Sequence, residues 1–470
     1  MLRPMSAAAS ASESAARTAA VTGRAIARLA RTAGLAPGGG GDPSGRRSAV
    51  ATAPGRVNLV GEHVDHAGGP CLPVAIDLVA AAAVACSAAG PADPPQRDLR
   101  IDAEGFGVRE RPLVRRPAEA RSTPGHWSDL VAGAVAAGLE DVRTARATGT
   151  GAASAARTIV RVAIASDLPA GGGLASSAAV ATATLLATRR AALGGDGRDD
   201  EDPPRRAAPE VRRLAELVRR VEHEAAGTPC GLMDMLAALA GRPGRALLLD
   251  LAAGTIEPVP LPERLGLLVV PTASRHVLAE DDYARVPRDA AAAARRLGLE
   301  GPGLAAAADP PATAAAGLAA WTAAGFPPAL RAVARHVVLE TWRTRVAARI
   351  LRRAAATTSD AAAGAVDREL SRLAPILAAS HRSLSLGLGV STPTLDRIAA
   401  AAARLAATGR TFGGRMIGGG FGGSALVLVP APIDPATRAE LAAATDLDGP
   451  AELRAIEVRP SGAAAAARTT

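Results

Sequence analysis

The chain has 470 residues and a formal net charge of +9, with 48% hydrophobic and 21% charged residues. This composition is typical of a globular protein, and the length predicts two or three domains. No lysine occurs, which excludes a Walker-A lysine, the strand lysine of protein kinases and a lysine Schiff base to pyridoxal phosphate.

The sequence of the N-terminal half predicts a loose leader, followed by alternating strands and helices. Residues 1–45 are rich in small residues, and we expect a loose extension with a short helix from Arg24 to Arg31. The residues that follow alternate between strand-like and helix-like patterns. The expected elements are a linker at 37–45, strands from residue 49 and at 157–166, a helix at 178–193, an exposed loop at 194–208 and a helix at 210–226.

The C-terminal half predicts short apolar strands, at 246–251 and 265–271, before an Ala- and Pro-rich stretch at 301–330. Two helices are expected next, followed by a strand, a glycine turn and a strand in RMIGGGFGGSALVLVP. This mixture predicts a two-domain α/β or α+β enzyme with a boundary near residues 255–265.

The positive charge would indicate nucleic acid if it were clustered. The arginines are instead spread along helix-like segments, and aromatic residues make up only 2% of the chain, so few rings can stack on bases. We expect no nucleic-acid partner and interpret these arginines as replacements for lysine on solvated faces. Examples are Arg212, Arg213, Arg219 and Arg220.

The cysteines and the apolar segments indicate a cytoplasmic protein. Cys71, Cys86 and Cys230 form no CxxC pair, which is typical of a reducing compartment. The N-terminus lacks the apolar core of a signal peptide. The longest apolar stretch is interrupted by Pro73 and Asp77, so we expect no membrane span.

Rare residues mark the segments that carry chemistry. Asn58 is the only asparagine and Tyr283 the only tyrosine. Four motif-like segments stand out in the chain, and each of these residues lies in one of them: Asn58, Met233, Met235 and Met416. In a chain so biased toward Ala, Arg and Gly, we interpret their retention as a sign of a specific requirement.

The first segment, residues 53–69, places Glu62, His63 and Asp65 in one turn. Such a turn offers the paired hydrogen bonds that the hydroxyls of a polyol need when they lose water. A solvated polar turn is the alternative. A metal site is excluded, because too few imidazoles lie at ligand spacing.

The second segment, residues 167–179, has three consecutive glycines between a strand and a helix. Backbone N–H groups in such a turn close on a phosphate, and the N-terminus of the following helix adds a favourable dipole. Ser176 and Ser177 are candidates to cap the helix or to bind a phosphate-bound Mg²⁺. An ordinary glycine turn is the alternative.

The third and fourth segments are a carboxylate pair and a second glycine turn. Glu222 and Asp234 stand on either side of a Pro-Cys-Gly turn, where one would hold a metal and the other would face a substrate. The alternative is a helix-surface Glu and a capping Asp. The glycine turn at 413–424 would, alone, indicate only a tight turn.

Together and in this order, the four segments resemble the GHMP small-molecule kinases and, among them, the galactokinase family most closely. The similar stretches are GRVNLVGEHVDHAGG, LPAGGGLASSAA, EHEAAGTPCGLMD and RMIGGGFGGSALVLV, within residues 49–430. The resemblance implies an α+β fold, with an N-terminal ribosomal S5 domain 2-like domain (46–258), a C-terminal ferredoxin-like domain (259–460) and a tail (461–470). It places the active site between the two domains.

The resemblance also implies ATP-dependent phosphorylation of D-galactose at its C1 hydroxyl, with Mg²⁺. Asp234 and Arg56 would be catalytic, and Ser177 and Glu222 would hold the metal. The residues implied for the sugar are Glu62, His63, Asp65, Gly231, Asp234 and Tyr283. Those implied for ATP are Gly171, Gly172, Gly173, Leu174, Ala175, Ser176, Ser177 and Trp127.

The physical chemistry of phosphoryl transfer agrees with these roles, since it needs mainly positioning and charge neutralisation. We expect Arg56 to lower the pKa of Asp234 and keep it ionised. The segments depart from the family pattern at four places. Met235 replaces a glutamine, Val64-Asp65-His66 replaces Thr-Asp-Tyr, Ala175-Ser176-Ser177 replaces Ser-Ser-Ser, and Asp129 and Leu130 replace Asn-Tyr.

These departures leave two alternatives open. One is a kinase for a related sugar, such as arabinose or N-acetylgalactosamine. The other, suggested by Met235 and His66, is a non-catalytic sensor that binds sugar and ATP. We expect a monomer or a weak homo-oligomer.

Overall fold

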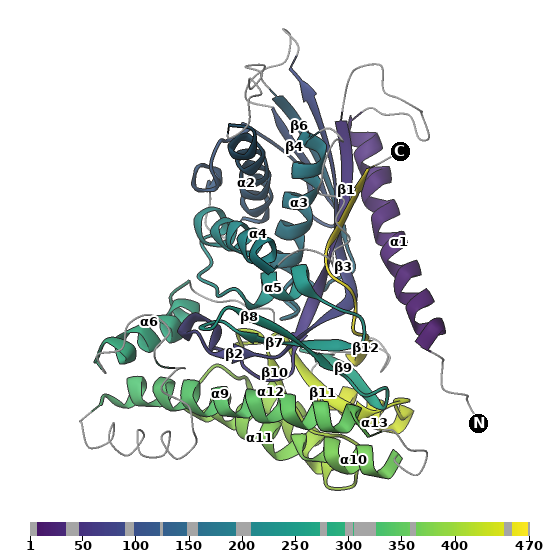
Figure 1. Cartoon of the computed structure of the whole chain (residues 1–470), viewed down its shortest axis with the longest axis vertical. Coiled ribbons are helices and arrows are strands. Elements are labelled where there is room, and N and C mark those ends of the chain that lie inside the picture. Colours follow the sequence, from purple (N-terminus) through teal and green to yellow (C-terminus); the bar gives the residue numbers. More distant parts are fainter. Residues whose placement is uncertain are drawn as a thin grey trace.

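The computed structural model describes residues 7–33, 47–89, 98–122, 126–147, 158–193, 208–272, 280–296, 304, 326–357, 363–445 and 454–468. The predicted linker at 37–45, the loop at 194–207 and most of the stretch at 301–330 lie outside these residues. Helices are combined with largely antiparallel sheets (Figure 1), so the prediction of an α+β fold is confirmed. None of the described helices has the length and apolar character that crossing a membrane requires.

The N-terminal part is built on a six-stranded sheet. Alanine and other small residues dominate its long central strand, so helices can pack closely on it. One face carries α2 (Trp127–Ala147) and α3 (Ser176–Leu193), with α4 (Ala208–Val221) and α5 (Met233–Ala240) beside them (Figure 1). The strand order is β13 (Ala465–Arg468), β1 (Arg47–Asn58), β3 (Pro73–Ala88), β6 (Thr158–Ser166), β4 (Leu99–Ala103) and β5 (Gly107–Arg111).

The opposite face of this sheet is covered by α1 (Ala7–Ala33) (Figure 1). Val21, Ala25 and Leu29 recur every four residues and pack on the alanine-rich backs of β1, β3 and β6. The helix expected from Arg24 to Arg31 lies within α1, but the prediction of a loose extension is wrong for the rest of residues 7–33. The apolar surface that orders the helix comes from strands far away in the sequence.

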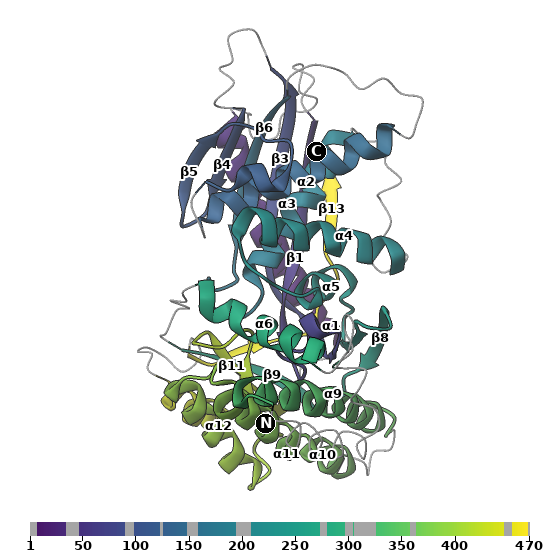
Figure 2. The same ribbon diagram turned by 90° about the vertical axis from the view of Figure 1, so that its left-hand side faces the viewer.

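The C-terminal part has a four-stranded antiparallel sheet in the order β10 (Gly414–Ile417), β11 (Ser424–Pro430), β9 (Leu265–Pro271) and β12 (Ile456–Val458). Helices form a layer below it (Figure 2). These are α9 (Pro328–Ala355), α10 (Ala363–Ser371), α11 (Leu373–Arg382), α12 (Pro393–Ala406) and α13 (Pro435–Ala443). Where two helices were expected before β10, the described residues form four. The break at Arg372 between α10 and α11 lies just before Pro375, which has no N–H to donate to the carbonyl of Ser371.

A small sheet of β2 (Pro70–Cys71), β7 (Arg245–Asp250) and β8 (Thr255–Pro260) lies between these parts. The predicted domain boundary at 258 falls inside β8, so the chain crosses to the C-terminal part only after this strand. The predicted tail at 461–470 is not separate where the structure describes it, up to residue 468. Its strand β13 pairs with β1 and satisfies the edge of the N-terminal sheet.

Candidate active site

A cavity of about 400 Å³ lies where the N-terminal and C-terminal parts meet. Its walls come from the turn after β1, the turn before α5 and the glycine turn between β10 and β11, with α4 and α6 (Glu280–Arg296) contributing further residues. The lining includes Arg56, Glu62, His63, Asp65, His66, Gly231, Asp234, Gly418 and Gly419.

The structure therefore brings together the predicted catalytic residues and most of the predicted sugar residues. Tyr283 lies in the first turns of α6. Its side chain is outside the described part of the chain, so its predicted contact with the sugar stays a prediction. Pro287 of the same helix lines the cavity.

Arg56 and Asp234 form a two-pronged ion pair although 178 residues separate them. A β-bulge at Gly55 shifts the register of β1 just before Arg56, and Asp234 lies in the first turn of α5. Nε and Nη2 of Arg56 donate to the two carboxylate oxygens at 2.8 and 2.9 Å. Nη1 donates to the carbonyl of Gly173 at 2.5 Å. One guanidinium thus joins the carboxylate to the first glycine turn.

The pKa of Asp234 differs from the expectation. Burial raises the pKa of this carboxyl, while Arg56 opposes the rise. The predicted net lowering by Arg56 is therefore wrong, because burial could not be judged from the sequence. The side chain of Asp234 keeps 27% of its surface exposed, and the residue lines the cavity.

Glu62 is held by protein groups on both of its oxygens. It is 1% exposed, and burial raises its pKa against the opposing charge of Arg415. Oε1 accepts a hydrogen bond from the amide of Gly418 at 2.9 Å. Oε2 accepts one from Asn58 Nδ2 at 2.5 Å and pairs with Arg415. Glu62 therefore links the turn after β1 to the C-terminal glycine turn.

His63 is a neutral hydrogen-bonding group. Its φ of 55° is unusual for a residue other than glycine, and its Nε2 donates to the carbonyl of Gly419 at 3.1 Å. Burial, with help from His66 and His336, lowers the pKa of His63 to about 3. Because Nε2 carries the proton, Nδ1 is left as an acceptor.

Asp65 and Gly231 touch across the cavity wall. A Cβ on Gly231 would lie 1.9 Å from Oδ2 of Asp65, so a larger residue there would require Asp65 to move. The Pro-Cys-Gly turn is held by His223, whose Nε2 lies 2.8 Å from the carbonyl oxygen of Cys230 and 2.9 Å from its amide nitrogen. We did not single out His223 from the sequence, although it lies between two acidic residues of the third segment.

The glycine turn before α3 presents its backbone in an unusual conformation. Gly171, Gly173 and Ala175 all have φ between 60° and 72°. The carbonyl of Gly172 accepts from Ser424 at 2.7 Å, and those of Gly173 and Leu174 accept from Arg56 at 2.5 and 3.0 Å. In each of these peptide units the N–H points in the opposite direction to the carbonyl. The three N–H groups therefore point away from Ser424 and Arg56, just before α3 begins. This arrangement suits an anion.

Glu222 and Ser177 form a pair of oxygen donors at the start of α3. Ser177 donates a hydrogen bond to Glu222, which is buried. Burial, reinforced by the charge of Asp234, raises the pKa of Glu222 to about 7. No group of three or more His, Cys, Asp or Glu side chains among the described residues could hold a metal. A cation here would therefore need further ligands from water or substrate, as Mg²⁺ commonly does.

Trp127 begins α2 and does not line the cavity described above. Gly133 of α2 packs against Ala225, and Gly138 packs against Leu185 of α3. Arg146 near the end of α2 donates to the carbonyl of Ala192 near the end of α3 at 3.0 Å. The two helices therefore run in the same direction, and Trp127 lies toward the same end as the start of α3. Two further rings contact the Trp127 ring and were not singled out from the sequence. They are Phe106, at 5.6 Å between centroids, and His126, at 5.7 Å.

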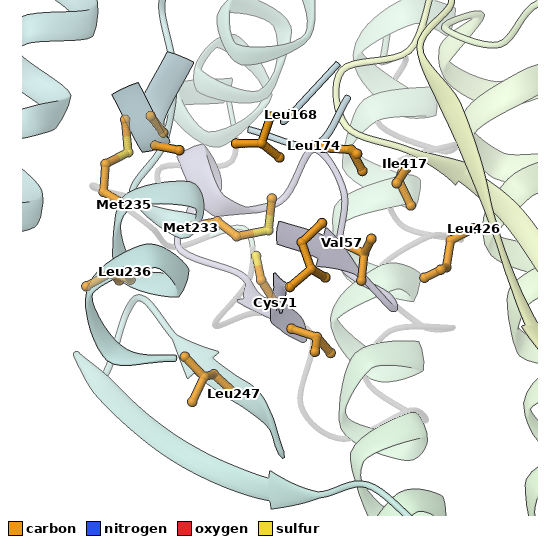
Figure 3. Close-up of a cluster of buried hydrophobic side chains, with 14 of the residues drawn as sticks. Val57, Cys71, Leu168, Leu174, Met233, Met235, Leu236, Leu247, Ile417 and Leu426 are labelled. Carbon is orange, nitrogen blue, oxygen red and sulfur yellow. The ribbon is translucent and has the colours of Figure 1, made fainter. Parts of the chain in front are cut away.

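The departures from the family pattern lie in different environments. Met235 is 1% exposed and belongs to the cluster of buried hydrophobic side chains drawn in Figure 3, so its surroundings are apolar. Asp129 is buried against Arg111 and Ser122. Ala175 is one of the residues with a positive φ. His66 alone among these departures lines the cavity.

Two family models match segments of the N-terminal half, and curated relatives match most of the chain. The galactokinase galactose-binding signature matches residues 42–86, and the GHMP kinases N terminal domain matches residues 140–242. Galactokinase from Bos taurus is 32% identical over 394 residues, covering 82% of this chain and 84% of that protein. Galactokinase from Mycobacterium tuberculosis is 32% identical over 391 residues, covering 81% and 88%.

Solved structures agree on the fold. Lactococcus lactis galactokinase complexed with galactose has a TM-score of 0.69 at 21% identity and covers 95% of this chain and 99% of that one. L. major mevalonate kinase in complex with R-mevalonate has a TM-score of 0.51 at 17% identity, with 90% and 99% covered.

Proposed function

The chain belongs to the galactokinase family of GHMP kinases, and from this premise we propose that it transfers the γ-phosphoryl group of ATP to the C1 hydroxyl of D-galactose. The products are α-D-galactose 1-phosphate and ADP. The observation that carries the proposal is the position of Arg56, which bonds both to Asp234 in the cavity wall and to Gly173 in the glycine turn.

The proposed reaction is an in-line transfer with Asp234 as the base. The C1 hydroxyl gives its proton to the carboxylate of Asp234 while its oxygen bonds to the γ-phosphorus, and the bond from that phosphorus to the ADP oxygen breaks. Arg56 neutralises charge at both centres. A base whose pKa is raised toward neutrality is a better proton acceptor in the transition state, provided it stays ionised.

The sugar is proposed to lie in the cavity of about 400 Å³. Asp65 accepts hydrogen bonds from sugar hydroxyls, and neutral His63 offers Nδ1 as a further acceptor. Glu62 can take one more hydroxyl in addition to its protein donors, because a carboxylate has about four lone-pair sites. Gly231 keeps the wall open beside Asp65, and Tyr283 is retained as a proposed contact.

The nucleotide is proposed to bind along the glycine turn, with its phosphates on the backbone of residues 171–177 and its base near Trp127. Ser177 and Glu222 are the residues that would hold Mg²⁺, since their oxygens suit this hard cation and Glu222 is a buried carboxyl beside the turn. When bound, Mg²⁺ supplies positive charge to the phosphates. We also propose a cytoplasmic location, because the free cysteines suit a reducing compartment.

The proposal is tested by measuring ADP release with a panel of galactose, arabinose, N-acetylgalactosamine and glucose, each with and without Mg²⁺. We expect release that depends on galactose and Mg²⁺, with the highest kcat/KM for galactose. A higher value for another sugar would reassign the substrate. Binding of galactose and ATP without phosphorylated product would favour the non-catalytic sensor.

A further inference from the structure

A buried polar cluster connects the turn after β1 to the C-terminal part of the molecule. Its centre is Arg415 of β10, which has no exposed surface. Nε of Arg415 donates to the carbonyl of Leu59 at 2.9 Å, and Nη2 donates to that of Asn58 at 3.0 Å. Nη2 also pairs with the carboxylate of Glu62. One C-terminal side chain therefore contacts three residues of the N-terminal turn.

Two residues of α9, Glu340 and His336, also form hydrogen bonds to this turn. Oε1 of Glu340 accepts from the amide of Gly61 at 3.1 Å and from Ser380 at 2.6 Å. Nε2 of His336 donates to the carbonyl of Glu62 at 2.9 Å. The backbone at four of the five residues from 58 to 62 is thus bonded to side chains of β10 and α9.

Asn58 holds the same turn from the N-terminal side. Its Oδ1 accepts from the amide of Leu72 at 3.2 Å, while its Nδ2 donates to Glu62 at 2.5 Å. Only an amide offers an acceptor and a donor in this shape. This double use accounts for the retention of the only asparagine in the chain.

Buried charges like these are weak evidence for stability, because the cost of removing them from water offsets much of their attraction. They do define geometry, since a bonded guanidinium and carboxylate tolerate few arrangements. The turn that they fix continues directly into His63 and Asp65, which line the cavity.

We propose that Arg415 is a positioning residue for the sugar. It holds the turn of residues 58–62 against the C-terminal part, and so sets where His63 and Asp65 meet the sugar hydroxyls. The inference rests on the proposed function, because it concerns the same cavity. Arg415 acts through Glu62 and the backbone of the turn.

The test compares Arg415→Met with Arg343→Met. Arg343 is a matched control, since it is also buried and donates to the same cluster at Glu340, at 3.0 Å, but within the described part of the chain it forms no hydrogen bond to the turn. We expect Arg415→Met to raise the KM for galactose about tenfold or more while the KM for ATP stays within about twofold, because buried turn carbonyls lose their donor. Arg343→Met should lose stability but keep the KM for galactose.

Arg415→Lys keeps a cation beside Glu62 and covers the case in which Arg415→Met does not fold. Lysine lacks the planar fork that reaches both carbonyls, so we expect a smaller rise in the same KM. The inference is overturned if the folded Arg415 variants keep the wild-type KM for galactose, or if Arg343→Met raises it equally. Wild-type enzyme that does not phosphorylate galactose would instead overturn the proposed function, and this inference with it.

Discussion

The proposed sugar site and the proposed phosphate site are built in different ways. Around the proposed sugar site, here called the sugar wall, buried side chains from distant segments interlock, as Glu62 does with Arg415 and Asn58. At the proposed phosphate site, here called the phosphate wall, the surface is mainly backbone, with glycines in left-handed conformations before α3. Side chains in fixed positions distinguish one sugar from another, whereas a backbone cradle binds phosphate without regard to the rest of the molecule.

The walls contact each other at several places, which together form the junction. Arg56 bonds to Asp234 on one side and to Gly173 on the other, and Gly173 packs against Ile417 and Gly418 of the second glycine turn. We therefore expect the rate of phosphoryl transfer to depend on the junction. The binding of the sugar and the binding of ATP should each depend on its own wall. The variants below test this separation, from the largest expected effect to the smallest.

The largest effect is expected at the junction, with Asp234→Asn. The amide keeps the shape of the side chain but cannot take the proton of the C1 hydroxyl, so kcat should fall by about 10²–10⁴-fold. The KM for galactose and for ATP should change little, since both walls remain. Steady-state ADP release measures all three values.

Asp167→Asn is the control for this change. Asp167 accepts from the amide of Val79 at 2.6 Å and does not line the cavity, so its variant should keep the wild-type kcat. An Asp234→Asn enzyme with undiminished kcat would show that the base is another group.

A pair of glycine variants tests whether the walls are separable. In Gly231→Ala the new Cβ would lie 1.9 Å from Asp65, so the sugar wall must shift. In Gly173→Ala the backbone has a φ of 71° and Ile417 lies 3.1 Å away. Strain of this kind costs about 1–3 kcal/mol. We expect the KM for galactose to rise in the first variant and the KM for ATP to rise in the second. If both variants raise the same KM, the separation fails.

His63, in the sugar wall, should also make the free energy of unfolding depend on pH. Its folded pKa of about 3 lies below the ordinary 6.5, so between these values the unfolded chain binds a proton that the folded chain does not. His63 therefore stabilises the fold fully above pH 6.5, and this contribution is lost as the pH falls toward 3. The slope is at most about 1.4 kcal/mol per pH unit.

His63→Asn isolates this contribution, because asparagine tolerates the positive φ. Free energies of unfolding are measured for wild type and variant at several pH values between 4 and 6.5. The difference in slope between the two proteins is the contribution of His63, even though other groups titrate in the same range. Equal slopes would mean that His63 is protonated in the folded state.

The residues of the candidate site were easier to predict from the sequence than the residues that hold them in place. Glu62, His63 and Asp65 lie within four consecutive residues, so their chemistry shows in a short window of sequence. Arg415 is 353 residues from Glu62, so no local pattern reveals their pairing. The burial that raises the pKa of Asp234 depends on the folded surroundings in the same way.

The fold was predictable where a segment carries its own signal. The strand at 157–166 alternates, and the helix after the glycine turn is apolar, and both are present as β6 and α3. Only residues 24–31 of helix α1 were expected to be helical, because alanine and serine give a weak pattern in the rest of it. The alanine-rich face that it covers belongs to strands much later in the chain.

The smallest effect is expected at Gly23, a glycine of α1 that neither wall uses. It is exposed, its φ is ordinary, and no atom lies within 4 Å of where a Cβ would stand. Because glycine weakens the interior of a helix, Gly23→Ala should stabilise the protein by about 0.5–1 kcal/mol. Denaturant unfolding measures the gain, and both KM values should equal those of wild type. The substitution adds the same methyl group as Gly231→Ala and Gly173→Ala, so opposite signs of effect would locate the requirement for glycine in the cleft. A loss of stability would mean that α1 does not pack on the sheet as a helix.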